Sequence, residues 1–295
     1  MNKKISGIAA LFLCTIIWGF AFIAQSVGMD KIGPFTFQAV RAALAVVFLV
    51  VFSLVMDLGR CRPSVSLAKW KNPQLWRNGL ICGVALFVAA SLQQVALVDT
   101  DAGKAGFLTA MYIVLVPVLG LFRGEKPPKT TLPSVALAVV GLYLLSCMGT
   151  TGIRRGDLLL IACALGFAVQ ITLVSRLSPG MDGFRMNCIQ CLTVCVLSLP
   201  FLLFEQPRWA DISAAWLPLL FAGVLSMGVA YSLQIVGQKY VEPTAASLIM
   251  SLESAFAALG GWWLLGERMT AGEYTGCALM FAAVVLSQLP ERKKA

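Results

Sequence analysis

The chain has 295 residues, of which 59% are hydrophobic and only 13% charged, and its mean hydropathy is +0.83. A soluble domain normally carries about 25% charged residues, so this chain has too few polar side chains to cover a water-facing globule of its size. The composition therefore excludes an ordinary soluble domain and indicates that lipid is the main solvent.

Ten apolar segments are long enough to cross a bilayer, because a spanning helix needs about 20 apolar residues at a rise of about 1.5 Å each. In chain order the predicted spans are Ile5–Met29, Ile32–Met56, Asn78–Val98, Ala105–Phe122, Thr130–Ile153, Leu158–Ser175, Met186–Phe204, Ile212–Gln238, Pro243–Gly266 and Tyr274–Pro290. Only two of the ten contain an ionisable charge, Arg41 and Glu253. The sequence predicts an all-α integral membrane protein of ten transmembrane helices without a soluble domain.

The connections between the predicted spans are short, with one exception. The segment from Asp57 to Arg77 is basic, contains Pro63 and Pro73, and is predicted to lie at the membrane interface. The first span is too long for the apolar core of a signal peptide, about 7–15 residues, and we expect it to remain as an anchor.

Basic residues are distributed unequally between the two sides of the predicted bundle. With the N-terminus inside, 16 of the 23 Lys and Arg fall on the inner side and 6 on the outer side, and Arg41 lies within a helix. Positive residues favour the cytoplasmic side, so this bias explains the net charge of +9 without a nucleic-acid partner. It predicts a multi-pass protein of the plasma (cytoplasmic) membrane with both termini in the cytoplasm.

The nine cysteines and the absence of histidine do not favour a metal site. Cys188, Cys191 and Cys195 share one helix face, but a structural zinc site needs four ligands, and small apolar packing is the expected role of these thiols. No phosphate-binding loop is present. We therefore expect no metal and no cofactor.

An internal repeat relates the two halves of the chain, residues 1–150 and residues 151–295. A shift of 142 positions aligns Gly124-Glu125-Lys126 with Gly266-Glu267-Arg268, and a shift of 149 aligns Pro34…Gln38…Arg41 with Gly183…Asn187…Gln190. Each half contains five predicted spans, and this odd number makes the second half enter the membrane from the opposite side. The sequence thus predicts two inverted-topology repeats, an arrangement that transporters use for alternating access.

These features resemble the drug/metabolite transporter superfamily, and specifically its EamA-type exporters. The resemblance rests on Trp18-Gly19 in the first span, Pro34…Arg41 in the second, the two Gly-Glu-basic triplets and Tyr240–Leu248 at the entry to the ninth span. It covers roughly residues 5–290 and implies movement of a small molecule across a membrane by alternating access, often as export. The second half departs from the pattern, with Phe167-Ala168 in place of Trp18-Gly19 and Gln190 in place of Arg41.

Two charged residues within the predicted spans are candidates for function, because an ionised side chain in the bilayer is costly unless it is paired or hydrated. Glu253 is either a proton-coupling or cation-binding group or a protonated partner in a bond between helices. Arg41 either binds an anionic group of the substrate or has a structural role. An ion pair between Arg41 and Glu253 is a third option.

Polar and aromatic side chains form stripes on several predicted spans. They serve either as links between helices or as the lining of a substrate cavity. A lining of aromatic rings and amides suits an amphipathic or zwitterionic solute. The predicted substrate-binding residues are Trp18, Gln25, Gln38, Arg41, Tyr112, Gln170, Gln190, Tyr231 and Gln234, with Glu253 as the coupling residue. Pro117 is either a hinge or a packing bend in the fourth span.

The sequence predicts a secondary active exporter of small organic metabolites, such as amino acids or related amphipathic solutes. Its partners are the solute, the lipid bilayer and, through Glu253, protons. The alternatives are a non-transport membrane scaffold and an intramembrane enzyme. The enzyme is disfavoured because the spans offer neither histidine nor paired carboxylates for acid–base chemistry.

Overall fold

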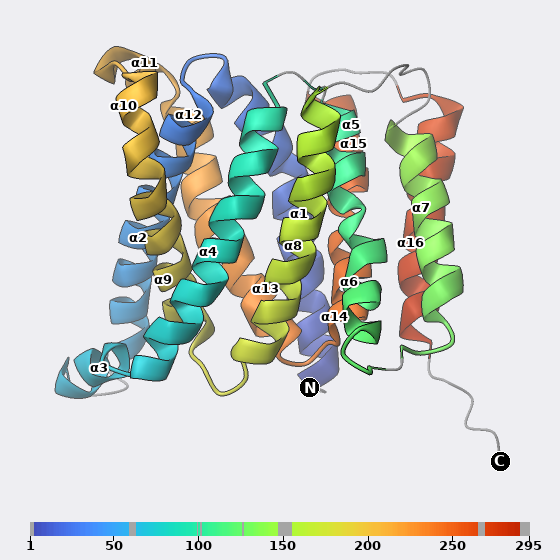
Figure 1. Ribbon diagram of the computed structural model, residues 1–295, viewed down its shortest axis with the longest axis horizontal. Coiled ribbons are helices and arrows are strands. Elements are labelled where there is room, and N and C mark those ends of the chain that lie inside the picture. The colour runs from blue at the N-terminus through green and yellow to red at the C-terminus, as the bar shows by residue number, and fades with distance from the viewer. Residues whose placement is uncertain are drawn as a thin grey trace.

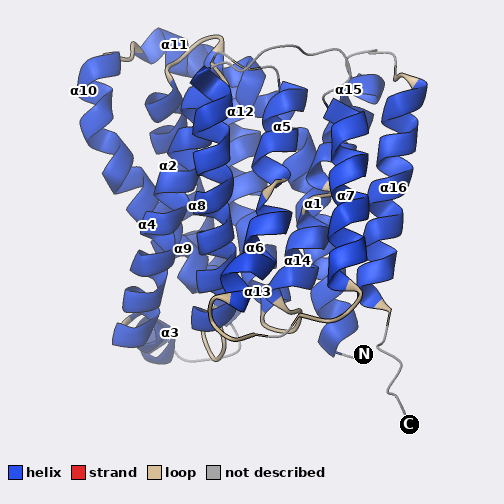
Figure 2. Ribbon diagram, turned by 45° about the vertical axis from the view of Figure 1, so that its right-hand side comes forward, coloured by secondary structure: helices blue, strands red, loops and turns tan. Residues whose placement is uncertain are grey.

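The structure, a computed structural model, describes residues 3–58, 63–98, 100, 102–125, 127–146, 155–264 and 269–289. These residues form helices joined by turns and short loops, with no strand among them (Figures 1 and 2). The long helices run side by side in one bundle, and short helices lie at its ends (Figure 1).

The helices follow one another with few residues between them. Up to residue 146 they are α1 (Lys3–Met29), α2 (Pro34–Asp57), α3 (Pro63–Trp70), α4 (Pro73–Ala96), α5 (Ala102–Ala110), α6 (Tyr112–Leu121) and α7 (Thr131–Ser146). From residue 155 they are α8 (Arg155–Leu177), α9 (Gly183–Ser198), η1 (Leu199–Phe201), α10 (Leu202–Glu205), α11 (Trp209–Ala214), α12 (Trp216–Leu220), η2 (Phe221–Ala230), α13 (Tyr231–Gln238), α14 (Pro243–Met250), α15 (Glu253–Leu264) and α16 (Ala271–Gln288).

Six helical segments in the described part of the chain are long and apolar enough to cross a membrane. They are Lys3–Met29, Pro34–Asp57, Pro73–Ala96, Arg155–Leu177, Gly183–Glu205 and Trp216–Gln238. Two shorter apolar segments, Ala105–Leu121 and Thr131–Leu145, accompany them.

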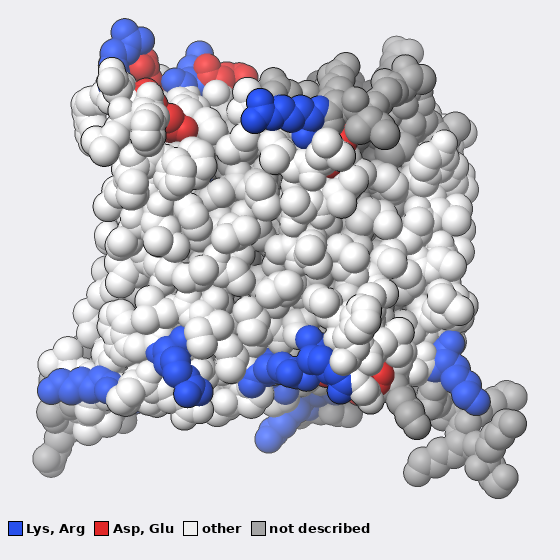
Figure 3. Space-filling view, viewed as in Figure 1, with Lys and Arg blue, Asp and Glu red and all other residues white. Residues whose placement is uncertain are grey.

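The outer surface is apolar and the interior contains many polar groups. Val47, Leu132 and Phe204 are 63%, 78% and 85% exposed, whereas Gln38 and Arg41 are buried. On the face in Figure 3, Lys and Arg gather near the two ends of the bundle and leave an uncharged band between them. This distribution is the reverse of that in a soluble protein, so the chain is a multi-pass membrane protein whose apolar band faces lipid.

Two predicted spans are interrupted in their interior, and the eighth, expected over Ile212–Gln238, is divided near its start at Ala215. The fourth, expected over Ala105–Phe122, is divided at Met111 into α5 and α6, and the ninth, expected over Pro243–Gly266, is divided at Ser251 and Leu252 into α14 and α15. Hydrogen bonds that reach three residues back, as in a 3₁₀-helix, mark the first interruption. The Met111 N–H donates to the Leu108 carbonyl, and the Val114 N–H donates to the Met111 carbonyl. Pro117, the expected bend, lies inside α6 instead.

The long connection after α2 contains a helix that the sequence did not predict. Pro63 begins α3, Pro73 begins α4, and both occupy the first helical turn, where a missing N–H costs nothing. α3 lies across the lower end of the bundle in Figure 1. Asp57, the last residue of α2, accepts hydrogen bonds from Ser66 and Lys69 and thereby ties α3 to the bundle.

The bundle is organised around α1. This helix packs against η2, α13, α14 and α15, while α4 packs against α8 and α9, α2 against α9 and η2, and α7 against α16. Gly19 makes the contact between α1 and α15 possible, because a Cβ there would overlap the Cβ of Phe256. The neighbouring Trp18 is thereby placed in the interior of the bundle.

Candidate functional site

A cavity lies in the interior of the bundle, where α1, α2, α8 and α13 meet the two interrupted helices. Its lining residues are Trp18, Ala21, Phe22, Gln25, Arg41, Gln93, Thr109, Tyr112, Phe167, Ile171, Ser226, Tyr231, Gln234, Met250 and Glu253. The volume that the centre of a water molecule can occupy is about 40 Å³. A single water needs about 10–15 Å³ by this measure, so the cavity holds a few waters in this conformation and must widen for a larger solute.

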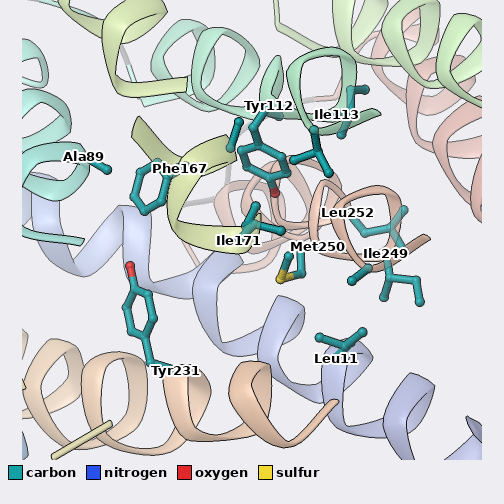
Figure 4. Close-up of a cluster of buried hydrophobic side chains, with 14 of the residues drawn as sticks. Leu11, Ala89, Tyr112, Ile113, Phe167, Ile171, Tyr231, Ile249, Met250 and Leu252 are labelled. Carbon is teal, nitrogen blue, oxygen red and sulfur yellow. The ribbon is translucent and has the colours of Figure 1, made fainter. Parts of the chain in front are cut away.

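The interrupted helices bring polar groups to the cavity wall. Thr109 and Tyr112 flank the break between α5 and α6, and Met250 and Glu253 flank the break between α14 and α15. Irregular backbone is tolerated at membrane depth where it is buried in protein or lines a cavity, and broken helices of this kind commonly form transporter sites. Figure 4 shows Tyr112 and Met250 pointing into the same interior region as Ile171.

Arg41 is the cationic group of the cavity, and it is held by amides. Its Nη1 donates to Gln25 Oε1 at 2.5 Å and its Nη2 to Gln38 Oε1 at 3.0 Å, while Gln38 Nε2 donates to Ser91 Oγ at 2.8 Å. The Nε of Arg41 is buried without a hydrogen-bond partner among the described residues. The guanidinium is therefore fixed in direction with a positive charge that no described carboxylate neutralises.

Glu253 is the acidic group of the cavity. It is the first residue of α15 and is 6% exposed, and its Oε1 accepts a hydrogen bond from the Tyr112 hydroxyl at 3.1 Å. The N-terminus of a helix favours a negative group, which is a local reason for a carboxylate at this position. Both Glu253 and Arg41 belong to the described part of the chain, and the direct ion pair between them that the sequence left open is not formed there.

Two aromatic residues close one side of the cavity. The rings of Trp18 and Tyr231 meet edge to face with centroids 4.7 Å apart, and Trp18 Nε1 is buried with no partner in the described part of the chain. In Figure 4 the Tyr231 hydroxyl points toward the side of the cavity where Phe167 lies. This wall combines the apolar surfaces of two rings with the indole N–H of Trp18, which is free to donate a hydrogen bond.

Three buried amides form a cluster beside the cavity. Gln170 and Gln234 exchange hydrogen bonds at 3.4 and 3.1 Å, and Gln170 also donates to Gln190 at 3.5 Å. Only Gln234 of the three lines the cavity. The cluster links α8, α9 and α13 behind the wall.

The structure brings most of the predicted site residues together. Those that line the cavity are Trp18, Gln25, Arg41, Tyr112, Tyr231, Gln234 and Glu253. Gln38, Gln170 and Gln190 do not line it and instead bond to residues that do, or to each other. Their predicted direct contact with a solute is therefore not supported by this conformation, and their geometry is that of supporting residues.

Several lining residues were not predicted. Ala21, Ile171 and Met250 carry no polar signal that separates them from core residues. Ser226 is polar, but it lies five residues before Tyr231. This spacing does not place two side chains on one face of an α-helix.

Two of the three cysteines on the face of α9 lie against main-chain carbonyls of neighbouring helices. Cys188 Sγ lies 3.9 Å from the Val46 carbonyl and Cys191 Sγ 3.8 Å from the Met227 carbonyl. Among the described residues, no group of three or more Cys, Asp or Glu is arranged to hold a metal ion. The second Gly-Glu-basic triplet, Gly266-Glu267-Arg268, lies outside the described residues.

The chain is similar in sequence and in fold to known proteins. The chain is 31% identical to an uncharacterized transporter of Archaeoglobus fulgidus over 288 residues, covering 97% of this chain and 87% of that protein. It is 26% identical to the threonine/homoserine exporter RhtA of Escherichia coli over 286 residues, covering 94% and 89%. A solved crystal structure with 18% sequence identity superposes with a TM-score of 0.79 over 96% of both chains, which shows the fold alone.

The two sequence relatives are named as transporters and not as enzymes, which removes the intramembrane enzyme from the alternatives. The model of the EamA-like transporter family matches residues 5–147 and residues 154–289 of the sequence. Together these ranges cover nearly the whole chain, so the protein belongs to the EamA-like transporter family.

Proposed function

We propose that the protein is a secondary active exporter of small zwitterionic or amphipathic metabolites, such as amino acids, that works by alternating access. The observation that carries the proposal is that a basic and an acidic side chain line the same cavity. They are Arg41 and Glu253, and no ion pair joins them in the described part of the chain. A free amino acid carries a carboxylate and an ammonium group, which complement a guanidinium and a carboxylate.

The energetics favour a ligand with both charges. A buried charge without a partner of opposite charge costs several kcal/mol. Arg41 is 4% exposed, its hydrogen bonds among the described residues go to amide oxygens, and its guanidinium lies over the Phe37 ring, 5.5 Å from the ring centroid. A substrate carboxylate offsets that cost and also accepts from the free Nε of Arg41. The name of the relative RhtA, a threonine/homoserine exporter, supports both the substrate class and the direction.

The proposed architecture is ten spans in two inverted five-helix repeats, residues 1–150 and residues 151–295. The two separate family matches support this division. The breaks support it too, because the interrupted pair α5 and α6 holds the fourth position in the first half, and α14 and α15 hold it in the second.

Reciprocal glycine contacts also support a two-fold relation. A Cβ on Gly141 of α7 would lie 2.8 Å from the Gly276 carbonyl, and one on Gly276 of α16 would lie 2.6 Å from the Gly141 carbonyl. α7 and α16, the fifth helices of the two proposed halves, therefore cross each other closely. A Cβ on Gly83 would lie close to Gln190, and one on Gly223 would lie close to Arg41. Arg41 and Gln190 are the residues that the sequence repeat aligns, so the two halves make corresponding contacts.

Glu253 is the proposed coupling residue. In this scheme a proton and the ammonium group of the solute compete for one carboxylate, so that inward movement of the proton drives outward movement of the solute. Positive-inside bias supports a plasma-membrane location with both termini in the cytoplasm. The small volume of the cavity fits an occluded state that must open on either side for exchange.

The test is reconstitution into liposomes with a panel of amino acids and control solutes, with and without a pH gradient. We expect flux of at least one zwitterionic solute above that of protein-free liposomes, increased by a gradient that is acidic on the side receiving the solute. Glu253→Gln should remove the effect of the gradient, and the exchange that remains should need a higher solute concentration, because the carboxylate that meets the ammonium group is lost. Unchanged gradient dependence in Glu253→Gln contradicts the coupling role, and flux of no solute contradicts the transport proposal and favours the scaffold.

A further inference from the structure

The segment η2 has an unusual helical geometry beside the cavity. It is a π-helix of 10 residues, and at its end the Tyr231 N–H donates to the carbonyl of Ser226, five residues back. α-Helices bond four residues back, and π-segments are rare and frequently occur at functional sites. The residues that stabilise this π-geometry are therefore candidates for a functional role.

The π-geometry decides which side chains reach the cavity. Ser226, Tyr231 and Gln234 all line it. In an α-helix, at about 100° per residue, side chains five positions apart differ by about 140° in direction, so Ser226 and Tyr231 would not share a face. Where the bonds run five residues back, these two positions come onto the same face of the helix, and Gln234 then follows Tyr231 at ordinary α-helical spacing.

One side chain on a neighbouring helix holds this segment. Asn187 of α9 is fully buried, and its Nδ2 lies 2.8 Å from the Met227 carbonyl, 3.0 Å from the Gly228 carbonyl and 3.0 Å from Ser232 Oγ. The Gly228 carbonyl also accepts a hydrogen bond from the Ser232 hydroxyl, at 2.7 Å. Within the described part of the chain, the only other side-chain donor to the Met227 carbonyl is the weak Cys191 thiol at 3.8 Å, so Asn187 is the stronger of its two side-chain donors.

Close packing against α2 also confines the same segment. A Cβ on Gly223 would lie 2.8 Å from the main-chain carbonyl of Arg41, and one on Gly228 would lie 2.7 Å from the Phe48 ring. η2 thus packs against α2, which carries the cationic residue of the cavity, and is bonded by Asn187 of α9.

The place of Asn187 in the repeat fits a supporting role. The shift of 149 positions that aligns Arg41 with Gln190 also aligns Gln38 with Asn187. Gln38 lies behind the cavity and accepts from Arg41 at 3.0 Å. Both aligned amides therefore orient a lining element from behind without lining the cavity themselves.

We propose that Asn187 is a positioning residue that holds η2 in its π-geometry and so keeps Ser226 on the cavity face together with Tyr231 and Gln234. The substrate role of that face rests on the proposed function, whereas the geometric role of Asn187 does not. Loss of the amide should turn Ser226 away from the cavity and lower the affinity for solute, while the remaining helices stay in place.

The first test reads the geometry without transport. In a background whose nine cysteines are replaced by alanine or serine, Ser226→Cys is labelled with 2-aminoethyl methanethiosulfonate in membranes, with and without Asn187→Leu. We expect Asn187→Leu to slow labelling at position 226 by about tenfold or more, as a small misplacement suffices for such an effect. Labelling of Gln25→Cys on α1 is the reference and should change little.

Matched variants separate positioning from general damage. Thr193→Val lies on the same helix and removes a hydroxyl that bonds to its own helix, at the Ile189 carbonyl, and should leave labelling at position 226 unchanged. Asn187→Ser keeps one donor and should give an intermediate rate, which keeps the test valid if Asn187→Leu does not fold. Labelling rates at position 226 that are the same with the native Asn187 and in the Asn187→Ser and Asn187→Leu variants overturn the proposal.

The second test uses flux of a solute identified in the liposome panel. Asn187→Leu should raise KM by about tenfold with a smaller change in maximal rate, the pattern of lost binding. A fall in maximal rate with KM unchanged contradicts positioning of the binding face. If no solute is transported by the parent protein, the proposed function fails, and the labelling experiment still decides the role of Asn187.

Discussion

Glu205 at the end of α10 caps the first turn of α2. Its Oε1 accepts the Phe35 N–H at 2.9 Å, and its Oε2 accepts the Thr36 N–H at 2.7 Å and the Thr36 hydroxyl at 2.5 Å. The N-cap position of α2 is Gly33, which has no side chain to cap the helix. A carboxylate from a distant part of the sequence therefore satisfies the free N–H groups.

The size of this contribution follows from the contacts. A side-chain N-cap contributes about 0.5–2 kcal/mol, the attraction between a carboxylate and the helix dipole adds about 0.3–1 kcal/mol, and a hydrogen bond to a charged group contributes about 1.5–3 kcal/mol. These terms overlap, and Glu205 is only partly buried. We expect Glu205→Ala to lower the free energy of unfolding by about 2–3 kcal/mol, and Glu205→Gln, which keeps one acceptor oxygen, by about 1 kcal/mol.

The assay is reversible unfolding in lipid bicelles, supported by thermal unfolding in detergent. Asp211→Ala is the matched control, because Asp211 pairs with an Arg208 side chain that is 81% exposed, and such surface pairs contribute about 0–1 kcal/mol. The reasoning is refuted if Glu205→Ala is as stable as the parent protein, or if Asp211→Ala costs as much as Glu205→Ala.

Three further predictions follow from other contacts. Arg41→Lys keeps the charge but loses the forked donor geometry that reaches both Gln25 and Gln38, so flux of a zwitterionic solute should show a KM raised about tenfold; an unchanged KM argues against carboxylate binding there. Gly276→Val should destabilise the protein by at least about 1–3 kcal/mol, because a Cβ meets the Gly141 carbonyl at 2.6 Å, whereas Ala278→Val on the exposed face of α16 should cost little in the same unfolding assay. Partial burial raises the pKa of Glu125, but hydrogen bonds from Arg176 and Arg123 outweigh it, and the pKa is lowered overall. The stabilisation lost in Glu125→Gln should therefore be seen at neutral pH and disappear as pH falls below the ordinary carboxyl range of about 4; a difference that grows on acidification contradicts this assignment.

The membrane class and most of the helices were predictable because hydropathy depends on local composition. The places where two of the helices are interrupted were not predictable. The Ala105–Phe122 segment contains Pro117, the residue most expected to disturb a helix, yet the break falls at Met111. The second break, at Ser251 and Leu252, has no sequence signal at all. Where a helix breaks depends on its neighbours, and those contacts are not visible in one segment.

The candidate site was predictable where polarity and regular helical spacing agree. Trp18 and Gln25 follow the α-helical repeat on α1 and line the cavity. Gln170 and Gln190 are equally polar but bond to other amides, and composition does not distinguish a lining amide from a supporting one. Ser226 was missed because its spacing to Tyr231 has meaning only in a π-helix, which the sequence did not indicate.

The central claim is that one cavity is exposed to either side in turn while it binds a zwitterionic solute. Counterflow tests it most directly, with proteoliposomes preloaded with an unlabelled amino acid and a trace of labelled amino acid added outside. We predict transient accumulation of label above its equilibrium level, abolished when preloaded solute is omitted and weakened in Arg41→Lys. Entry of label that rises only to equilibrium, with or without preloading, would show a channel or a leak and contradict the account.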